Sequence, residues 1–411
     1  MSKHPRTKRR MSLGHIVTII VLVVLAVLVF LLQLQRNELA TELPEQHHGE
    51  RWSLSGTRSG QASVYFNESS GITRDKIREF DYKMNQGITR AGFQGSEALP
   101  EDDNTVWGSC YSAAGMLTVA NGRRSVSTLA YGVGGDFFQF HPMELAGGYL
   151  FDGTAVMKDY VVLDENLAWQ LFGSNDISGK TVEINGIPHL ITGVVRVGTN
   201  RFYKAAGMNK TVIFTSFETL ATYGTIDNTA ITSAAASSKD ASTDASSSKS
   251  KDSDSGNEVV GVASDVAEGV GGITCYEVVM PSPVDGYVPS FVIETLGFDV
   301  ENVEVMDNSS RFGNRHLLSV LGHYSTRSMQ FKAVVYPYWE NAARAVEDIS
   351  ALILVLQMIC ILIIVILLLI VIVQGYRHKK WTIESAWQGF KDWQYDVSAN
   401  MKNQHEKWKY F

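Results

Sequence analysis

The sequence is poor in cysteine and has no excess of basic residues. Only three cysteines occur in 411 residues, and their spacing matches no metal-binding motif. The formal net charge of -7 is too acidic overall to suggest a nucleic-acid-binding protein. No segment has the form GxxxxGK[ST], so the printed sequence offers no phosphate-binding loop. These absences predict no nucleic-acid partner, no metal and no cofactor.

Apolar residues are concentrated in two long runs, 16–34 and 349–373. As a helix, each run is long enough to cross a hydrocarbon core of roughly 30 Å. We expect two transmembrane helices, the first of them retained as an anchor. A signal peptide is the alternative for the first run. That run is longer than the usual roughly 7–15 residues of a signal core, and no small-x-small cleavage site follows it.

Basic residues flank both apolar runs and predict the orientation of the chain. Cytoplasmic segments beside membrane helices carry an excess of Lys and Arg. We therefore expect the N-terminal segment 1–15 and the tail 374–411 to lie in the cytoplasm, with the region between the runs outside the plasma membrane. The basic residues are Lys3, Arg6, Lys8, Arg9 and Arg10 before the first run, and Arg377, Lys379 and Lys380 after the second.

The outer region reads as an α+β core with an insertion. Residues 35–58 are polar and are expected to form an exposed stalk. Strand-like and helix-like periodicities alternate in 59–224 and again in 259–335. Between them, residues 225–258 consist mainly of Ser, Ala, Asp and Lys, so we expect a flexible insertion there. Residues 336–348 have helical spacing and predict a stalk helix that continues into the second apolar run.

The stretch 161–195, VVLDENLAWQLFGSNDISGKTVEINGIPHLITGVV, predicts a βαββ unit. Asp164 is placed to accept backbone hydrogen bonds as an N-cap, and Gly173 to end the helix in a left-handed conformation. The Asn185-Gly186 pair suits a type I′ hairpin turn. Every signal in this stretch serves folding, so we interpret it as scaffold and not as catalytic machinery.

Two further local signals are clear. The segment 73–88 has apolar residues on one helical face, with Thr73 as the predicted N-cap and Gly87 as the predicted end. The Asn121-Gly122 pair lies between two strand-like runs and predicts a hairpin.

Catalytic constellations are weak in this sequence. A Gly-rich segment at 132–140 lacks the spacing of a dinucleotide fingerprint. Four histidines of the outer region show no metal-binding spacing, so we expect surface or helix-capping roles for His141, His189, His316 and His323. Several carboxylates share one region, but no acid–base pair can be placed among Asp136, Glu144, Asp152, Asp164 and Glu165. We expect a protein that is not an enzyme.

Cys110 and Cys275 both lie in the outer region, where an oxidising compartment would allow a disulfide between them. Two isolated buried thiols are the alternative. Cys360 lies inside the second apolar run, where we expect it to serve packing.

Aromatic residues flank the second apolar run on both sides. On the outer side they form either an interfacial belt or a partner-contact surface, comprising Tyr336, Tyr338, Trp339 and the neighbouring Arg344. The cytoplasmic tail interleaves basic residues with Trp381, Trp387 and Trp393. It is expected either to contact the membrane surface or a partner, or to be a disordered tail with a few anchoring aromatics.

Two consecutive segments carry a family resemblance. GVGGDFFQFHPMELAGGYLF, followed by DYVVLDENLAWQLFGSNDISGKTVEINGIPHLITGVV, resembles the periplasmic core domain of MacB-type ABC transporter permeases over roughly 130–196. The resemblance implies an extracytoplasmic domain of two α+β subdomains, held on a helical stalk between two transmembrane helices. It implies no catalytic residues in this domain.

The printed chain departs from that family in one respect. MacB-type permeases have further membrane helices after the one that follows the core domain, and no further apolar run occurs here. We expect a two-span, truncated member that acts with an ABC ATPase, a multi-span permease subunit or both, in contact with membrane lipid. Homo-oligomerisation is left open. The alternative is a stand-alone cell-surface binding or sensory module.

Overall fold

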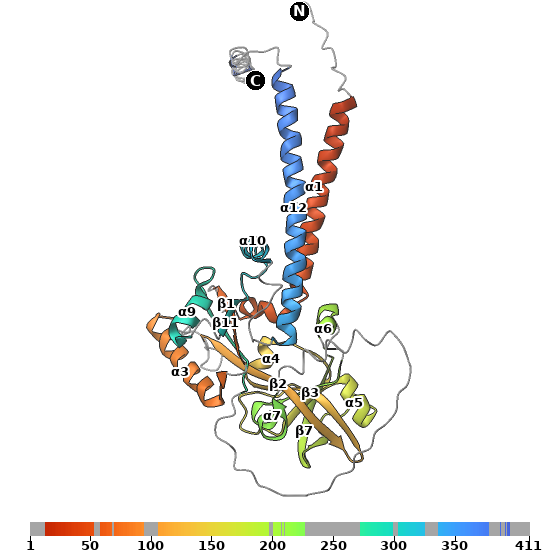
Figure 1. Cartoon of the computed structure of the whole chain (residues 1–411), viewed down its shortest axis with the longest axis vertical. Coiled ribbons are helices and arrows are strands. Elements are labelled where there is room, and N and C mark those ends of the chain that lie inside the picture. Colours follow the sequence, from red (N-terminus) through yellow and green to blue (C-terminus); the bar gives the residue numbers. More distant parts are fainter. Residues whose placement is uncertain are drawn as a thin grey trace, which may run out of the picture. The chain divides into compact units, whose positions relative to one another are not determined.

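The structure is a computed structural model of the whole chain (Figure 1). It describes residues 13–52, 58–67, 70–93, 106–196, 200–206, 208, 210–226, 272–298, 303–324, 336–377, 387, 391, 393 and 394. The chain divides into two compact units, which we describe separately. One is the outer domain, Arg36–Leu354, and the other combines Met1–Gln35 with Val355–Phe411.

A mixed sheet forms the centre of the outer domain. In the part that the structure describes, eleven strands follow the order β11-β1-β10-β2-β3-β8-β5-β7-β4, while β6 pairs with β2 and β7, and β9 pairs with β2. The strands are β1 (Ser59–Phe66), β2 (Gly108–Asn121), β3 (Arg124–Gly135), β4 (Glu144–Gly148), β5 (Tyr160–Asp164), β6 (Thr181–Ile184), β7 (Ile187–Arg196), β8 (Val212–Ser216), β9 (Thr225–Ile226), β10 (Cys275–Pro281) and β11 (Val303–Asp307).

The two ends of the sheet differ in strand direction. From β11 to β3 every neighbouring pair is antiparallel, whereas β3 pairs with β8, and β5 with β7, in parallel. The long β2–β3 hairpin belongs to both ends and turns at Gly122, whose φ is 61°. The mixture of an antiparallel sheet with separate helices confirms the predicted α+β class.

Four helices cover one face of the sheet. These are α3 (Arg74–Arg90), α5 (Glu165–Phe172), α7 (Phe217–Tyr223) and α9 (Tyr287–Leu296). Figure 1 shows α3 and α9 beside β1 and β11, with α5 and α7 near β2 and β3. Alternate residues of β1 and β10 point into this core, among them Val64, Phe66, Tyr276 and Val278.

The opposite face of the sheet packs against shorter elements and one long helix. These are η1 (Pro44–His47), α2 (His48–Arg51), α4 (Phe137–Phe140), α6 (Arg201–Ala205) and the outer part of α12 (Tyr338–Arg377). The helix α10 (Asn314–Gly322) packs against α12 instead, through Leu317 and Val320. Leu43 and His48 are buried on this face of the sheet, so the prediction of an exposed stalk at 35–58 is wrong for these residues, whereas Glu38 and Glu42 are exposed. Sequence polarity misled because Glu45 and Gln46 are themselves buried, where their side-chain oxygens accept hydrogen bonds from Tyr203 and Arg311.

The local signals are largely confirmed. Thr73 caps α3, and Asp164 caps α5 by accepting from two backbone N–H groups. Asn185 and Gly186 both have positive φ, as the predicted hairpin turn requires. The predicted end at Gly87 is wrong, since α3 continues to Arg90.

The second unit contains two long apolar helical segments. They belong to α1 (Leu13–Thr41) and α12, and the stretches Ile16–Thr41 and Tyr338–Arg377 are long and apolar enough to cross a membrane. Gln357 of α12 donates to the Val29 carbonyl at 3.4 Å and to Gln33 Oε1 at 3.3 Å. Interhelical hydrogen bonds of this type help apolar helices to associate. The polar interruption in the second run therefore has a packing role.

Some predicted segments lie outside the described residues. They are 1–12, most of the insertion predicted at 225–258, and the tail residue Trp381. The first two residues of that predicted insertion, Thr225 and Ile226, form β9 against β2.

Candidate functional site

The outer part of α12 is packed into the core of the outer domain. Tyr338 and Trp339 are 3% and 1% exposed. Their rings contact Tyr131 of β3 at centroid distances of 5.7 Å in each case. Burying aromatic rings of this size contributes several kcal/mol in total. The base of α12 is therefore fixed to the sheet by packing alone, before any ion pair is considered.

A buried arginine fastens the same helix to the domain. Arg311 is fully buried and donates Nη1 and Nη2 to the two carboxylate oxygens of Glu340, at 2.6 and 2.7 Å. Its Nε donates to Glu347 Oε1 at 2.6 Å. Glu340 and Glu347 lie two turns apart on α12, so both face the same side. Burial opposes the charge, but the two carboxylates raise the pKa of Arg311 well above its usual value.

Arg344 extends this network toward the sheet edge. It donates Nε to Glu340 Oε1 at 2.7 Å and Nη2 to Glu304 Oε1 of β11 at 2.6 Å. Its guanidinium lies 3.8 Å from the centre of the Tyr336 ring, a cation–π contact. Tyr65 of β1 donates to Glu340 Oε2 at 3.1 Å. Glu340 therefore links α12 directly to Tyr65 of β1 and, through Arg344, to Glu304 of β11.

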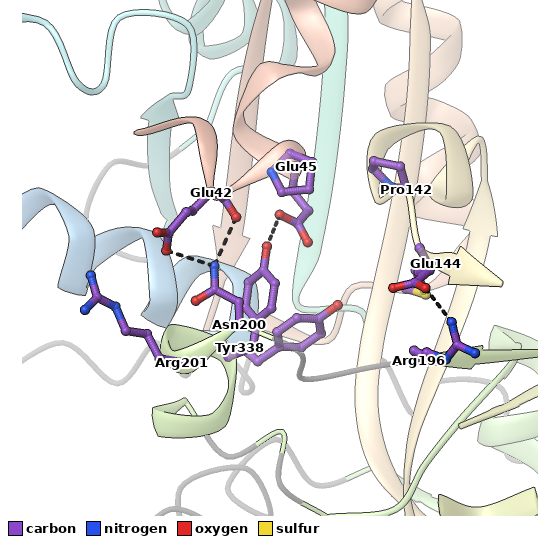
Figure 2. Close-up of a pocket in the computed structure, with 11 residues that line it drawn as sticks. Glu42, Glu45, Pro142, Glu144, Arg196, Asn200, Arg201 and Tyr338 are labelled. Carbon is purple, nitrogen blue, oxygen red and sulfur yellow. Dashed lines mark hydrogen bonds and ion pairs between the residues drawn. The ribbon is translucent and has the colours of Figure 1, made fainter. Parts of the chain in front are cut away.

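A polar cavity of about 760 Å³ lies on the α12 side of the outer domain (Figure 2). Tyr203 donates to Glu45 at 2.5 Å, and Asn200 donates to the Glu42 carbonyl at 3.1 Å. Burial raises the pKa of Glu45, an effect that the charge of His141 and the bond from Tyr203 offset only in part. The described lining is Glu42, Pro44, Glu45, Pro142, Met143, Glu144, Arg196, Asn200, Arg201, Tyr203 and Tyr338.

The lining of this cavity contains both signs of charge and two tyrosines. No described residue of the lining is a nucleophile beside a base. Arg196 of β7 and Glu144 of β4, which are neighbours in the sheet register, form an ion pair in its lining (Figure 2).

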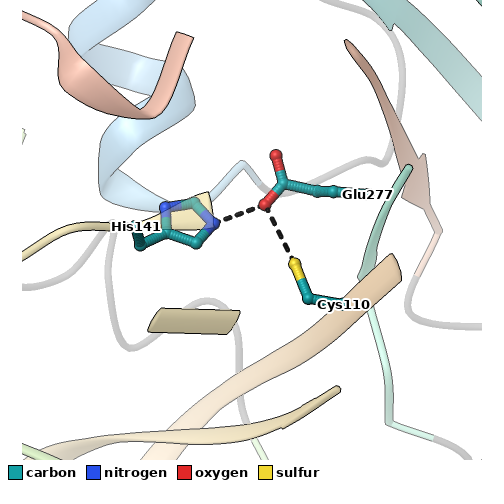
Figure 3. Close-up of side chains that lie close together, drawn as sticks. All are labelled: Cys110, His141 and Glu277. Atoms are coloured by element: carbon teal, nitrogen blue, oxygen red, sulfur yellow. Dashed lines mark hydrogen bonds and ion pairs between the residues drawn. The ribbon is translucent and has the colours of Figure 1, made fainter. Parts of the chain in front are cut away.

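A second polar cluster is enclosed in the sheet (Figure 3). Cys110 of β2 and Glu277 of β10 are directly paired across the two strands, and His141 reaches the same carboxylate from the turn after α4. Cys110 Sγ lies 3.6 Å from Glu277 Oε2. Burial would raise the pKa of Glu277, but the charge and hydrogen bond of His141, with bonds from Ser63 and Cys110, lower it overall.

The sequence of the outer domain matches a known family over residues 54–249, the MacB-like periplasmic core domain. Residues 54–249 belong to the MacB-like periplasmic core domain family. We call the outer domain, which contains them, the MacB-like domain. The resemblance drawn from residues 130–196 is therefore confirmed.

Curated relatives agree over a shorter stretch. The macrolide export ATP-binding/permease protein MacB of Neisseria gonorrhoeae is 36% identical over 93 residues, which are 22% of this chain and 14% of the relative. MacB 1 of Aeromonas hydrophila is 32% identical over 101 residues, covering 24% of this chain and 16% of the relative. The chain thus matches about one seventh of the length of these relatives.

Two solved structures match part of the chain at low sequence identity. The periplasmic region of MacB from Actinobacillus actinomycetemcomitans gives a TM-score of 0.34 at 14% identity, covering 61% of this chain and 90% of that one. The extracellular domain of the noncanonic ABC-type transporter YknZ from Gram-positive bacteria gives 0.33 at 12% identity, covering 60% and 99%.

The MacB-like domain gives the predicted contact residues a different role. Tyr336, Tyr338 and Trp339 are buried within it, at 4%, 3% and 1% exposure, so they form neither a lipid belt nor a free docking surface. Arg344 pairs with Glu340 and Glu304. In the described part of the tail, Trp387 and Trp393 are 60% and 61% exposed, and their partner role stays a prediction.

Of the two alternatives for Cys110 and Cys275, the structure has the two separate buried thiols and no disulfide. Cys110 and Cys275 have free thiols. Cys110 pairs with Glu277, and Cys275 with Ser112, so the two cysteines are diagonal neighbours. Diagonal neighbours in a sheet lie about 7–8 Å apart, beyond the usual disulfide range.

Sequence reasoning missed both buried polar clusters of the MacB-like domain. His141 was expected at the surface or at a helix cap, yet it is fully buried. One signal was available, since Glu277 interrupts the otherwise apolar strand CYEVVMP and buried carboxylates need partners. The carboxylates near 136–165 do not form an acid–base pair among the described contacts, and Asp164 serves as the α5 cap.

Proposed function

We propose that this chain is a non-enzymatic membrane subunit that works with a partner ABC ATPase, a multi-span permease subunit or both. In this role the MacB-like domain lies outside the membrane and both termini lie in the cytoplasm. The domain links events at the ATPase to export or to another process of the cell envelope. The printed names of the curated relatives, which join ATP binding and permease, support this assignment of partners.

One structural observation carries the proposal. α12 is a single helix of 40 residues, and its first turns are fixed in the core of the MacB-like domain. Arg311 holds Glu340 and Glu347 of that helix with both carboxylates fully buried. A helix held this firmly at one end and apolar along the rest is suited to pass a displacement between membrane and domain.

The test is affinity purification of the tagged full-length chain from its native cells in mild detergent, followed by mass spectrometry. We expect an ABC ATPase or a multi-span permease to co-purify. A matched chain without residues 375–411 should lose that partner if the tail is the contact. Recovery of the full chain alone, or only with further copies of itself, would contradict the proposal.

The polar cavity favours one other function. A site of about 760 Å³ lined by tyrosines and charged groups fits a stand-alone binding or sensory module. A soluble ligand that raises the unfolding temperature of the full chain, and loses this effect when Tyr203 is replaced by Phe, would favour this alternative.

A further inference from the structure

Three strands of the MacB-like domain place a row of polar side chains in its core. Ser63 of β1, Glu277 of β10 and Cys110 of β2 are directly opposite one another in the sheet register. Residues at paired positions point to the same face, so the three side chains are neighbours. Ser63 donates to Glu277 Oε1 at 2.6 Å, which leaves Oε2 directed at Cys110 and His141.

His141 completes the cluster from outside the sheet. Its ring lies between Phe137 and Trp339, with centroid distances of 4.4 Å to each. Its Nε2 contacts Glu277 Oε2, while its Nδ1 is buried and has no hydrogen-bond partner among the described residues. Only one of the two ring nitrogens is therefore hydrogen-bonded among the described residues, so hydrogen bonding alone does not explain why the ring is buried here.

The three donor atoms are of the kinds that bind zinc. Cysteine sulfur, histidine nitrogen and carboxylate oxygen are the common protein ligands of Zn²⁺, at about 2.0–2.3 Å. Tetrahedral bonds of that length separate ligand atoms by roughly 3.5 Å. The ligand atoms of Cys110, His141 and Glu277 all lie within 4.8 Å of one another, and the pair Cys110 Sγ and Glu277 Oε2 is at 3.6 Å.

The burial and the charge of the three side chains also favour a bound divalent cation. Cys110, His141 and Glu277 are 1%, 0% and 1% exposed. A thiolate and a carboxylate together carry two negative charges, which a divalent cation neutralises inside a low-dielectric core. Ser63 and, behind it, Asn308 form a supporting chain of hydrogen bonds to the carboxylate, as outer groups do around metal ligands.

We propose that Cys110, His141 and Glu277 form a binding site for a divalent transition-metal ion, with zinc as the expected occupant. The ion replaces the hydrogen bond between His141 Nε2 and Glu277 Oε2, and the Nε2 proton of that bond moves to Nδ1, so that the neutral ring binds the ion through Nε2. It also displaces the Cys110 thiol proton, which leaves to solvent. Three protein ligands leave a fourth position of a tetrahedral ion for water.

The site joins elements that are distant in sequence. It ties β2 and β10 to the turn after α4, and the His141 ring rests on Trp339 of α12. Metal binding would therefore stabilise the same face of the domain that holds the base of α12. This inference does not depend on the proposed partners of the chain.

The test uses the full chain in detergent, carrying a tag without histidine. The chain is stripped with a chelator, reloaded with Zn²⁺ and analysed for metal content by plasma mass spectrometry. We expect one zinc per chain, retained after dialysis. The variants Cys110→Ser and His141→Gln should weaken Zn²⁺ binding by more than about tenfold. Cys275→Ser, on the same face of β10 but outside the cluster, should bind like the wild type.

A second readout does not depend on the folding of the Cys110 and His141 variants. Co²⁺ loaded into the wild-type chain should show a thiolate-to-cobalt charge-transfer band in the near ultraviolet, and Cys275→Ser should keep it. Two results would overturn the site. One is wild-type protein that retains no Zn²⁺ and shows no such band. The other is binding that is equal in wild type, Cys110→Ser and His141→Gln, which would assign the metal to another place.

Discussion

Arg311 and Glu340 form a two-point ion pair in which neither side chain is exposed to solvent. The guanidinium of Arg311 donates to both carboxylate oxygens, at 2.6 and 2.7 Å. Arg311 lies just before α10, and Glu340 is the third residue of α12. Parallel donation of this kind fixes orientation as well as distance. The pair therefore sets how α12 leaves the MacB-like domain.

Removing Arg311 should strongly destabilise the domain. Arg311→Met leaves Glu340 and Glu347 buried without their cation, and breaking a buried pair in this way costs about 3–5 kcal/mol. Chemical unfolding of the purified chain measures the change. Arg58→Ala is the matched control, because the Arg58–Asp285 pair is exposed and its loss should cost less than about 1 kcal/mol. Equal effects of the two variants would contradict the anchor.

Trp339 should behave as a core residue. It is 1% exposed, and Trp339→Ala should lower the free energy of unfolding by about 3–5 kcal/mol through lost burial and a residual cavity. Trp169 is 56% exposed, so Trp169→Ala should change it by less than about 0.5 kcal/mol. If Trp339→Ala were as mild as Trp169→Ala, the aromatic residues would be a surface belt after all.

Stability should fall as the pH drops toward 3. Burial, with the nearby charge of Arg51, lowers the pKa of His48 to about 3; Glu277 opposes this shift and His141 adds to it. The unfolded histidine binds a proton near pH 6.5, so between pH 6.5 and 3 only the unfolded chain is protonated. The contribution of neutral His48 to the free energy of unfolding is therefore fully present above pH 6.5. It is lost on acidification, at up to about 1.4 kcal/mol per pH unit.

The measurement is the free energy of unfolding at pH 7 and pH 5 for the wild type and two variants. His48→Gln should show a smaller loss on acidification than the wild type. His323→Gln changes an exposed histidine at the end of α10 and should follow the wild type. Identical pH dependence in all three would remove His48 from the explanation.

Two variants of Asp164 test the N-cap of α5, one that removes the hydrogen-bond acceptor and one that keeps it. Asp164 accepts from the backbone N–H groups of Asn166, Leu167 and Val212. Asp164→Ala should cost about 1–2 kcal/mol, whereas Asp164→Asn keeps an N-cap acceptor and should cost less. A thermal melt of each variant decides, and equal losses would show that the charge, and not the cap, matters.

Local signals made the βαββ unit predictable from sequence. Asp164, Gly173 and the Asn185-Gly186 turn each act on residues close to them in the chain. The long hairpin at Gly122 was predictable for the same reason. Such caps and turns depend on backbone conformation, which the sequence specifies within a few residues.

The polar clusters depend on strand register across long separations. Glu277 meets His141 at a sequence separation of 136 residues and Ser63 at a separation of 214. The periodicity of a sequence does not indicate which strands become neighbours.

The aromatic residues before the second apolar run were equally ambiguous, because a Tyr or Trp beside a membrane segment has the same sequence pattern whether lipid or a domain core covers it. Only the tertiary structure assigns Trp339 to the core.

The most direct test of the account measures ATP hydrolysis by the co-purified complex after α12 is interrupted. Four glycines inserted after Asp348 leave Arg311, Glu340 and Glu347 in place but break the helix beyond them. The control carries the same four glycines within 231–250. We predict that the insertion in α12 changes the hydrolysis rate while the partner stays bound, and that the control leaves the rate unchanged. Equal rates in wild type, insertion and control would contradict coupling through α12.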